Sequence, residues 1–194
     1  MTTKLARTPG RPRRFDPEAA IATAQRLFHA RGYDAVSIAD LTEAIGIKPP
    51  SFYAAFGSKM GLYARVLERY ACTGAIPLQA LLRADRPVAE CLSQVLEEAA
   101  RLYAADLDAA GCLVVEGTHC DDASAREAAC EFHSAAEKVI HNYIAQRHPQ
   151  DARQFTDYMG TVMAGLSAKS RAGYDPERLL EIARLAGRAF MALK

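Results

Sequence analysis

The amino-acid sequence predicts an all-α protein in which a compact three-helix unit precedes a larger helical domain. Apolar residues recur at spacings of three and four along most of the chain, and helix-capping patterns stand at the starts of these segments. No segment sustains the period-two alternation of a half-buried strand. Half of the 194 residues are hydrophobic and 24% are charged, which favours a packed core over disorder.

The first three predicted helices are short, and each has a defined start and end. The first covers residues 16–32, where an Asp-Pro pair supplies an N-cap and a first-turn proline and a glycine closes the helix. The second covers residues 37–46, opens with a Ser-x-x-Asp capping box and also ends at a glycine. The third, residues 49–57, opens with two prolines, which fit only the first turn of a helix.

The rest of the chain also follows a helical period. A serine at position 58 caps the next helix, a loop is expected over residues 77–87, and Ser124 with Glu127 forms a further capping box. The predicted later helices cover residues 59–70, 88–102, 124–143, 151–172 and 175–194. We therefore expect three parts: a basic arm (residues 1–14), a three-helix domain (residues 15–58) and a larger helical domain (residues 59–194).

Composition excludes several classes of protein. No apolar run approaches the roughly 18 residues that a membrane span needs, and the basic N-terminus lacks the apolar stretch of a secretory signal. The five cysteines include no Cys-x-x-Cys pair, which favours reduced thiols over a disulfide framework. We expect a cytoplasmic protein with no membrane partner.

Charge is distributed unevenly along a nearly neutral chain. Residues 1–70 carry eleven Lys or Arg against six Asp or Glu, a net of +5, whereas the remainder has a net of −4. The first fourteen residues contain five basic side chains and no acid. A basic front half predicts contact with a polyanion, although a charged tail that only aids solubility has the same composition.

Residues 37–57 have the pattern of a helix-turn-helix. Two short helices meet at a Gly-Ile-Lys turn, and Phe52 and Phe56 are expected to face inward, which leaves Ser51, Tyr53 and Ala55 on the outer side. The N-terminus of the third helix is expected to offer free backbone N–H groups to a phosphate. An αα-corner with no ligand is the alternative to a DNA-binding unit.

The residues from Phe15 to Leu67 resemble the DNA-binding domain of the TetR (tetracycline-repressor) family. The segments that carry this resemblance are Ala24-x-x-Leu27-Phe28-x-x-x-Gly32-Tyr33, Ser37-Ile38-x-x-Leu41, Ala44-x-Gly46-Ile47 and Phe52-Tyr53-x-x-Phe56-x-Ser58-Lys59-x-x-Leu62. The resemblance implies a homodimer that places residues 49–56 of each subunit in the major groove of a palindromic double-stranded operator, and a repressor that a small molecule releases.

The resemblance also assigns expected roles to residues. Ser37, Tyr53 and Lys59 match positions that hold the phosphate backbone. The base-reading positions are Lys48, Pro49, Pro50, Ser51 and Ala55. Because proline and alanine cannot form bidentate hydrogen bonds to bases, we expect the basic arm to add contacts in the minor groove, through Arg11, Arg13 and Arg14.

In the larger domain, the resemblance implies a dimer interface and an effector pocket. The last two helices would form a four-helix interface with a second copy through Phe155, Met159, Val162, Leu166, Leu179, Ile182, Leu185 and Phe190. The expected pocket residues are Tyr103, Cys112, Val115, His119, Phe132 and Met163. An ordinary apolar core would use the same residue types.

Three other functions remain open at this point. The Gly-Cys-Leu at residues 111–113 is similar to a segment of one branch of the family, which makes Cys112 a candidate redox or electrophile sensor. His119-Cys120 and Cys130-x-x-His133 could ligate a metal, although neither pair has the spacing of a dedicated metal motif, and we expect no metal or cofactor. An enzyme is disfavoured because the chain has neither a phosphate-binding glycine loop nor a Gly-x-Ser-x-Gly elbow.

Overall fold

The structure is a computed structural model that describes residues 15–193, and this part of the chain is helical with no strand. This confirms the predicted all-α class. The helices are α1 (Pro17–Arg31), α2 (Ile38–Ile45), α3 (Pro49–Phe56), α4 (Lys59–Thr73), α5 (Leu78–Leu81), α6 (Val88–Tyr103), η1 (Leu107–Ala109), α7 (Leu113–Gly117), α8 (Ala123–Ala145), α9 (Ala152–Arg171), α10 (Pro176–Gly187) and η2 (Arg188–Ala192).

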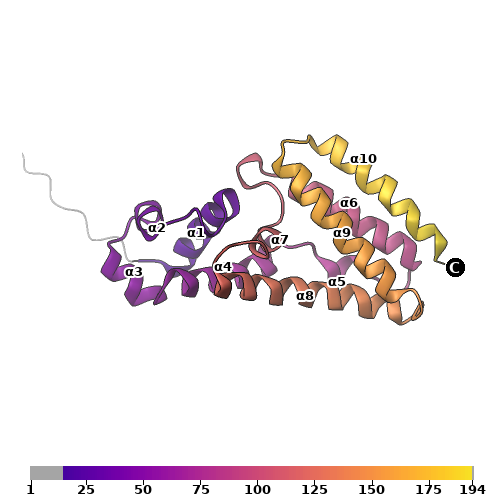
Figure 1. Cartoon of the computed structure of the whole chain (residues 1–194), viewed down its shortest axis with the longest axis horizontal. Coiled ribbons are helices and arrows are strands. Elements are labelled where there is room, and N and C mark those ends of the chain that lie inside the picture. Colours follow the sequence, from indigo (N-terminus) through magenta and orange to yellow (C-terminus); the bar gives the residue numbers. More distant parts are fainter. Residues whose placement is uncertain (1–14, 194) are drawn as a thin grey trace, which may run out of the picture.

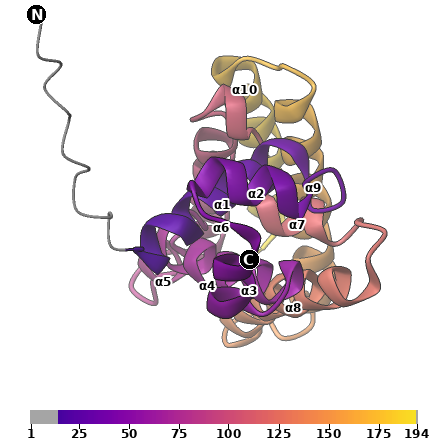
Figure 2. The same ribbon diagram turned by 90° about the vertical axis from the view of Figure 1, so that its left-hand side faces the viewer.

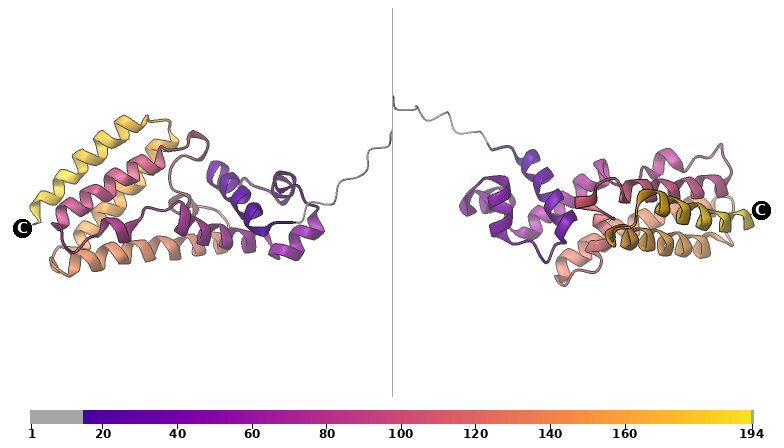
Figure 3. Two further views of the ribbon diagram at one scale, coloured as in Figure 1. Left: turned by 180° about the vertical axis from the view of Figure 1, so that it is seen from behind. Right: turned by 90° about the horizontal axis from the view of Figure 1, so that it is seen from above.

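The molecule is elongated, with α1, α2 and α3 at one end and the helices α6, α9 and α10 at the other (Figure 1). Helices α4 and α8 run along one side and connect the two ends (Figure 1). Seen from the end that carries α3, the first three helices lie in front of the larger bundle (Figure 2). The views from behind and from above show α10 packed along α6, at the end far from α3 (Figure 3).

The N-terminal helices begin where the capping residues predict. The side chain of Asp16 accepts hydrogen bonds from the backbone N–H groups of Glu18 at 3.0 Å and Ala19 at 3.3 Å, so α1 starts with a satisfied first turn. Ser37 and Asp40 form a complete capping box at the start of α2. Such caps stabilise a helix by about 1 kcal/mol each, which is large for helices of this length.

Three features of the larger domain differ from the sequence-based expectations. Helix α8 begins one residue earlier than predicted, because Asp122 rather than Ser124 is its N-cap and accepts from the N–H of Ala125 at 3.0 Å. The predicted loop over residues 77–87 contains the one-turn helix α5. Helix α7 and the turn η1 were also not predicted, because helices of three to five residues are too short to show a period.

Helix α4 joins the two ends of the molecule. It begins at Lys59, where the larger domain was expected to start, and extends to Thr73, three residues further than predicted. It packs against α1 on the N-terminal side and against α7 and α8 of the larger bundle. No helix in residues 15–193 has the length and apolar character needed to cross a membrane.

Candidate nucleic-acid interface and internal cavity

The turn between α2 and α3 depends on a left-handed glycine. Gly46 has φ 76° and ψ 34°, and its N–H donates to the carbonyls of Thr42 and Glu43 that the end of α2 leaves free. A residue with a Cβ would be strained in this conformation. The turn therefore fixes the direction in which α3 leaves α2.

Helix α3 presents an exposed outer face on a buried aromatic base. Phe52 is fully buried and Phe56 nearly so, and their rings pack 5.5 Å apart. The expected outer positions are exposed, with Tyr53 at 52% of its full surface, although Ala55 is half-buried. The four remaining candidate contact residues at the start of the helix are all exposed, namely Lys48, Pro49, Pro50 and Ser51.

The expectation that the N-terminus of α3 offers free N–H groups to a phosphate is wrong. Pro49 and Pro50 have no N–H, and the next two N–H groups, of Ser51 and Phe52, both donate to the carbonyl of Lys48 at 2.9 and 3.1 Å. The first turn thus has no spare backbone donor. Any anion near this end of α3 would have to be held by side chains, of which Lys48 and Ser51 are exposed.

Ser37, at the start of α2, is already engaged in hydrogen bonds. Its hydroxyl accepts from the N–H of Asp40 at 3.1 Å and also contacts the carboxylate of Asp40, which is paired with Arg31 at 3.0 Å. The bonds from Ser37 and the guanidinium of Arg31 hold the pKa of Asp40 well below its ordinary value. Arg31 therefore offsets the negative charge that Asp40 places beside this candidate phosphate contact.

Lys59 lies at the opposite end of α3, at the start of α4. Its ammonium nitrogen is 4.0 Å from the centre of the Tyr33 ring, and partial burial lowers its pKa from the ordinary lysine value. The ring limits where the ammonium can move, so its position is defined before any ligand binds. The candidate arm residues Arg11, Arg13 and Arg14 lie outside the described residues.

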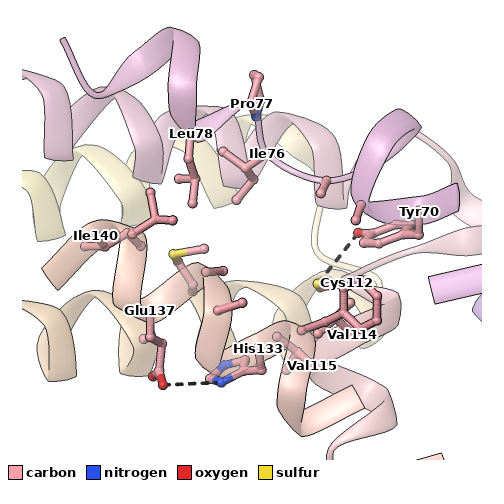
Figure 4. Close-up of a pocket in the computed structure, with 18 of the residues that line it drawn as sticks. Tyr70, Ile76, Pro77, Leu78, Cys112, Val114, Val115, His133, Glu137 and Ile140 are labelled. Atoms are coloured by element: carbon pink, nitrogen blue, oxygen red, sulfur yellow. Dashed lines mark hydrogen bonds and ion pairs between the residues drawn. The ribbon is translucent and has the colours of Figure 1, made fainter. Parts of the chain in front are cut away.

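A cavity of about 500 Å³ lies in the larger domain (Figure 4). Its walls come from the end of α4, from α5 to α9, and from the segment before α5. The lining residues are Tyr70, Ala71, Ala75, Ile76, Pro77, Leu78, Gln79, Ala80, Tyr103, Cys112, Val114, Val115, Phe132, His133, Ala135, Ala136, Glu137, Val139, Ile140, Thr156, Gly160 and Met163. This volume suits a small organic molecule.

The cavity brings together five of the six residues expected to form a pocket, and His119 is the exception. Tyr103, Cys112, Val115, Phe132 and Met163 line it. His119 does not, because its Nδ1 lies 3.1 Å from the carbonyl of Val115 and 3.0 Å from the hydroxyl of Thr118, at the end of α7. The expected assignment of His119 to the pocket is corrected on this ground.

Several lining residues were not predicted from the sequence. Ile76, Pro77 and Leu78 lie in and beside the short α5, in and next to the segment where the sequence predicts a loop. His133 and Glu137 are one turn apart on α8. The sequence indicates His133 only as a candidate metal ligand with Cys130 and does not predict Glu137 as a pocket residue. The helical spacing of His133 and Glu137 relative to Phe132 and Ile140 could have predicted that these side chains line the same cavity.

Cys112 lies at the inner end of the cavity, at the N-cap of α7. Its backbone N–H donates to the hydroxyl of Ser167 at 2.9 Å, and the hydroxyl of Tyr70 donates to its sulfur at 3.6 Å. Burial among apolar atoms raises the pKa of Tyr70 and of Tyr103, so both phenols stay neutral. The thiol is nearly buried and is reached from the cavity.

The cysteine and histidine pairs do not assemble into a metal site within residues 15–193. No three side chains of the ligating types His, Cys, Asp and Glu gather there in a suitable arrangement. Cys120 is buried with its thiol 3.6 Å from the carbonyl of Asp122, whereas Cys130 is exposed on α8. His133 instead faces Glu137, with Nδ1 3.6 Å from Oε2.

The cavity is connected to α1 through the segment that precedes Cys112. The imidazole of His29 on α1 donates to the carbonyl of Gly111 at 3.1 Å. Arg171, at the end of α9, donates to the carbonyls of His29 at 3.1 Å and Ala110 at 3.3 Å. A ligand that moves Cys112 would therefore act on a segment that is directly bonded to α1.

The expected dimer residues on α9 and α10 fall into two groups. Met159, Leu166, Leu179 and Phe190 are buried within the subunit's own core, so they cannot contact a second copy, and their assignment to an interface is corrected. Leu185 is 60% exposed, and the three others, Phe155, Val162 and Ile182, are half-buried. The apolar face of each helix packs mainly into the core of the subunit. Only the half-buried and exposed residues at its edge can contact a second copy.

The chain is similar to known transcription factors over almost its whole length. A sequence profile described as "Bacterial regulatory proteins, tetR family" matches residues 20–66. The chain is 55% identical to the HTH-type transcriptional repressor BdcR of Escherichia coli (strain K12) over 193 residues, which cover 100% of this chain and 98% of that protein. It is 29% identical to the HTH-type transcriptional repressor ComR of the same strain, with 94% and 92% covered.

A solved structure of an operator complex has the same fold. A cysteine mutant of the TetR family transcriptional regulator CifR, complexed with 26-bp double-stranded operator DNA, superposes with a TM-score of 0.84. It is 30% identical in sequence, and the match covers 92% of this chain and 99% of that one. The similarity thus includes both the helix-turn-helix end and the bundle that holds the cavity.

Proposed function

The chain belongs to the TetR family of DNA-binding transcription regulators, and we propose that it is a repressor that binds a palindromic operator as a homodimer and leaves it when a small molecule occupies the cavity. The observation that carries this proposal is the exposed outer face of α3, mounted on buried Phe52 and Phe56 in a fold that CifR uses on operator DNA. The protein acts in the cytoplasm, where bacterial DNA is found.

Each part of the chain has a defined task in this proposal. Residues 15–58 read DNA, residues 59–194 bind the effector and the second copy, and residues 1–14 place Arg11, Arg13 and Arg14 in the minor groove. On α3, Lys48 is the side chain suited to a guanine, whereas Pro49, Pro50 and Ala55 can contact thymine methyl groups. Ser51 adds a hydroxyl to the same face.

The phosphate contacts give a direct test of this DNA-binding surface. Replacing Lys59 by alanine is expected to weaken binding to all DNA sequences and to reduce the slope of log affinity against log salt by about one unit, because one fewer counterion is released. Replacing Tyr53 by phenylalanine is expected to weaken binding about tenfold, through loss of one hydrogen bond to a charged oxygen. Fluorescence anisotropy of labelled operator DNA at several salt concentrations measures both effects.

The matched control for Lys59→Ala is Lys138→Ala, which removes an exposed lysine from α8 in the larger domain. This control is expected to leave the salt slope unchanged. The operator is first obtained by testing the DNA upstream of the protein's own gene, and by selection from random sequences if that DNA is not bound. Unaltered affinity in both Tyr53→Phe and Lys59→Ala would remove α3 from the interface.

Release by an effector requires that the ligand bind the two states of the protein with different affinity. His29 and Arg171 form hydrogen bonds to the segment before Cys112. Through these bonds, a ligand in the cavity would change the orientation of α1 and of α4, which packs against it. In a dimer, rotation of α4 changes the distance between the two copies of α3, so that they no longer fit successive half-sites.

A second candidate function is a thiol sensor that uses the same DNA-binding surface, and the location of Cys112 favours it. The sulfur lines the cavity at the start of α7, next to the segment bonded to α1. In this proposal, oxidation or alkylation of Cys112 replaces non-covalent ligand binding as the signal.

Replacing Cys112 by serine separates the two signals. The variant is expected to bind the operator with normal affinity and to lose its response to diamide, because serine keeps the size of the side chain but not the thiol. Anisotropy with reduced and diamide-treated protein measures the response, and Cys72→Ser, which removes an exposed thiol from α4, is the control. A Cys112→Ser protein that diamide still releases would end the thiol proposal and leave the ligand-controlled repressor intact.

A further inference from the structure

Most of the residues that line the cavity are apolar. Ile76 and Leu78 from the α5 region lie across from Ile140 of α8 (Figure 4). Met163 of α9 also lines the cavity. The buried polar groups of Tyr70, Tyr103 and Cys112 also line it, and burial keeps the two phenols neutral. Gln79 and Thr156 add two uncharged polar side chains. The body of a ligand would therefore be enclosed by uncharged atoms.

Within residues 15–193, the lining includes one carboxylate, that of Glu137, and neither lysine nor arginine. Glu137 is on α8, with its carboxylate 3.6 Å from the ring nitrogen of His133 (Figure 4). Its side chain is 41% exposed, so it is accessible to solvent as well as lining the cavity. The carboxylate fits against α9 because Gly160 has no side chain. A Cβ at Gly160 would lie 3.1 Å from Oε1 of Glu137, closer than an ordinary van der Waals contact.

These charges set the kind of ligand that the cavity can take. An anionic ligand would find no lysine or arginine among the described residues of the lining, and it would lie beside the like charge of Glu137. A cationic nitrogen at the same place would form an ion pair with the carboxylate while the rest of the ligand fills the apolar space. Charge complementarity thus favours a ligand that carries a positive charge.

We infer that the effector cavity binds organic monocations, with an apolar ring system between α5, α8 and α9 and the cationic nitrogen against Glu137. This inference rests on the proposed function, in which the cavity is the effector site. Glu137 is the specificity-determining residue, and His133 holds the carboxylate from the neighbouring turn of α8.

The test uses three probes with one naphthalene body and different charges: 2-naphthylmethylammonium, 2-naphthylmethanol and 2-naphthoate. Naphthalene fluorescence polarisation gives the affinity of each for the full chain. We expect the cation to bind at least about tenfold more tightly than the alcohol, in line with one charge-assisted contact, and the anion to bind more weakly than both.

Two variants and one control test whether Glu137 causes the preference for the cation. Glu137→Gln keeps the shape of the side chain and is expected to bring the cation and the alcohol to equal affinity, whereas His133→Gln is expected to retain the preference. Glu131→Gln removes the same charge from an exposed position on the same helix that does not line the cavity, and it is expected to behave as the parent protein.

Three results would overturn the inference: an anion that binds as tightly as the cation, a cation preference that survives Glu137→Gln, or no binding of any probe at millimolar concentration. Operator binding is measured by anisotropy on the same preparations. Operator binding without cation selectivity would reject only the ligand class, whereas failure to bind any selected DNA would reject the regulator itself.

Discussion

Replacing Leu185 by glutamate is expected to convert the proposed dimer into a monomer and to lower operator affinity by at least about 100-fold. A dimer binds two half-sites at once, and the second contact is made at the high effective concentration that the first provides, so losing it removes the gain in avidity. Analytical ultracentrifugation measures the mass of the free protein, and anisotropy with operator DNA measures the affinity.

Leu185 is the appropriate position because it is the most exposed of the apolar residues expected at the interface, at 60% of its full surface. Burying a leucine against a partner stabilises a complex by about 1.5–3 kcal/mol, whereas a buried unpaired carboxylate costs several kcal/mol. On α9, Gly165 is exposed, and a Cβ there would meet nothing within 4 Å. A second copy can therefore approach closely at this point.

Leu107→Glu is the control, because Leu107 is even more exposed, at 85%, but belongs to η1 and not to α9 or α10. The same charge there is expected to change neither the mass nor the affinity. A Leu185→Glu protein that remains dimeric, with normal operator affinity, would place the interface on another surface.

The comparison of sequence and structure explains why only part of this interface could be predicted. The apolar period of α9 and α10 correctly predicts two amphipathic helices, but it cannot distinguish residues that face α6 from residues that would face a second copy. Leu179 and Leu185 belong to the same periodic stripe, yet the first is buried in the subunit and the second is exposed. Only the direction in which α10 packs on α6 separates them.

A similar limit applies to the site residues. The helix-turn-helix could be located from local signals, because Gly46, the capping residues and the Phe52–Phe56 pair act within a few residues of one another. The cavity depends on distant segments, and its α5 wall is a helix of four residues that carries no periodic signal. The sequence therefore shows Glu137 as a charged residue of a predicted helix, but it does not show that this carboxylate lines the cavity.

Replacing Phe28 by alanine is expected to lower the free energy of unfolding by about 3–5 kcal/mol and to remove operator binding at temperatures that the parent protein tolerates. Phe28 on α1 is fully buried, with its ring centre 5.6 Å from that of Tyr33 and 5.2 Å from that of Tyr63 on α4. Truncation is expected to leave a cavity between α1 and α4. The rings of Tyr33 and Tyr63 would have to leave their present contacts to fill it. Urea unfolding followed by far-UV circular dichroism measures the loss, because the chain contains no tryptophan.

The control is Phe132→Ala, which truncates the same side chain where it is half-buried beside the cavity. A ring with empty space on one side has fewer contacts to lose, so we expect a smaller decrease than for Phe28→Ala and normal operator binding. Equal decreases for the two variants would show that Phe28 contributes no more than an average aromatic contact.

The position of Phe28 also explains why the loss should extend to DNA binding. The ring of Tyr33 stacks on that of Phe28 and also contacts the ammonium of Lys59, which lies 4.0 Å from the centre of the Tyr33 ring. The hydroxyl of Tyr63 lies against Gly117 of α7, so close that a Cβ there would stand 2.3 Å from it. The three rings therefore join a candidate phosphate contact at one end to the helix that begins at Cys112 at the other. Removing Phe28 loosens α1 from α4, and α4 is the element through which a change in the cavity would have to reach α3.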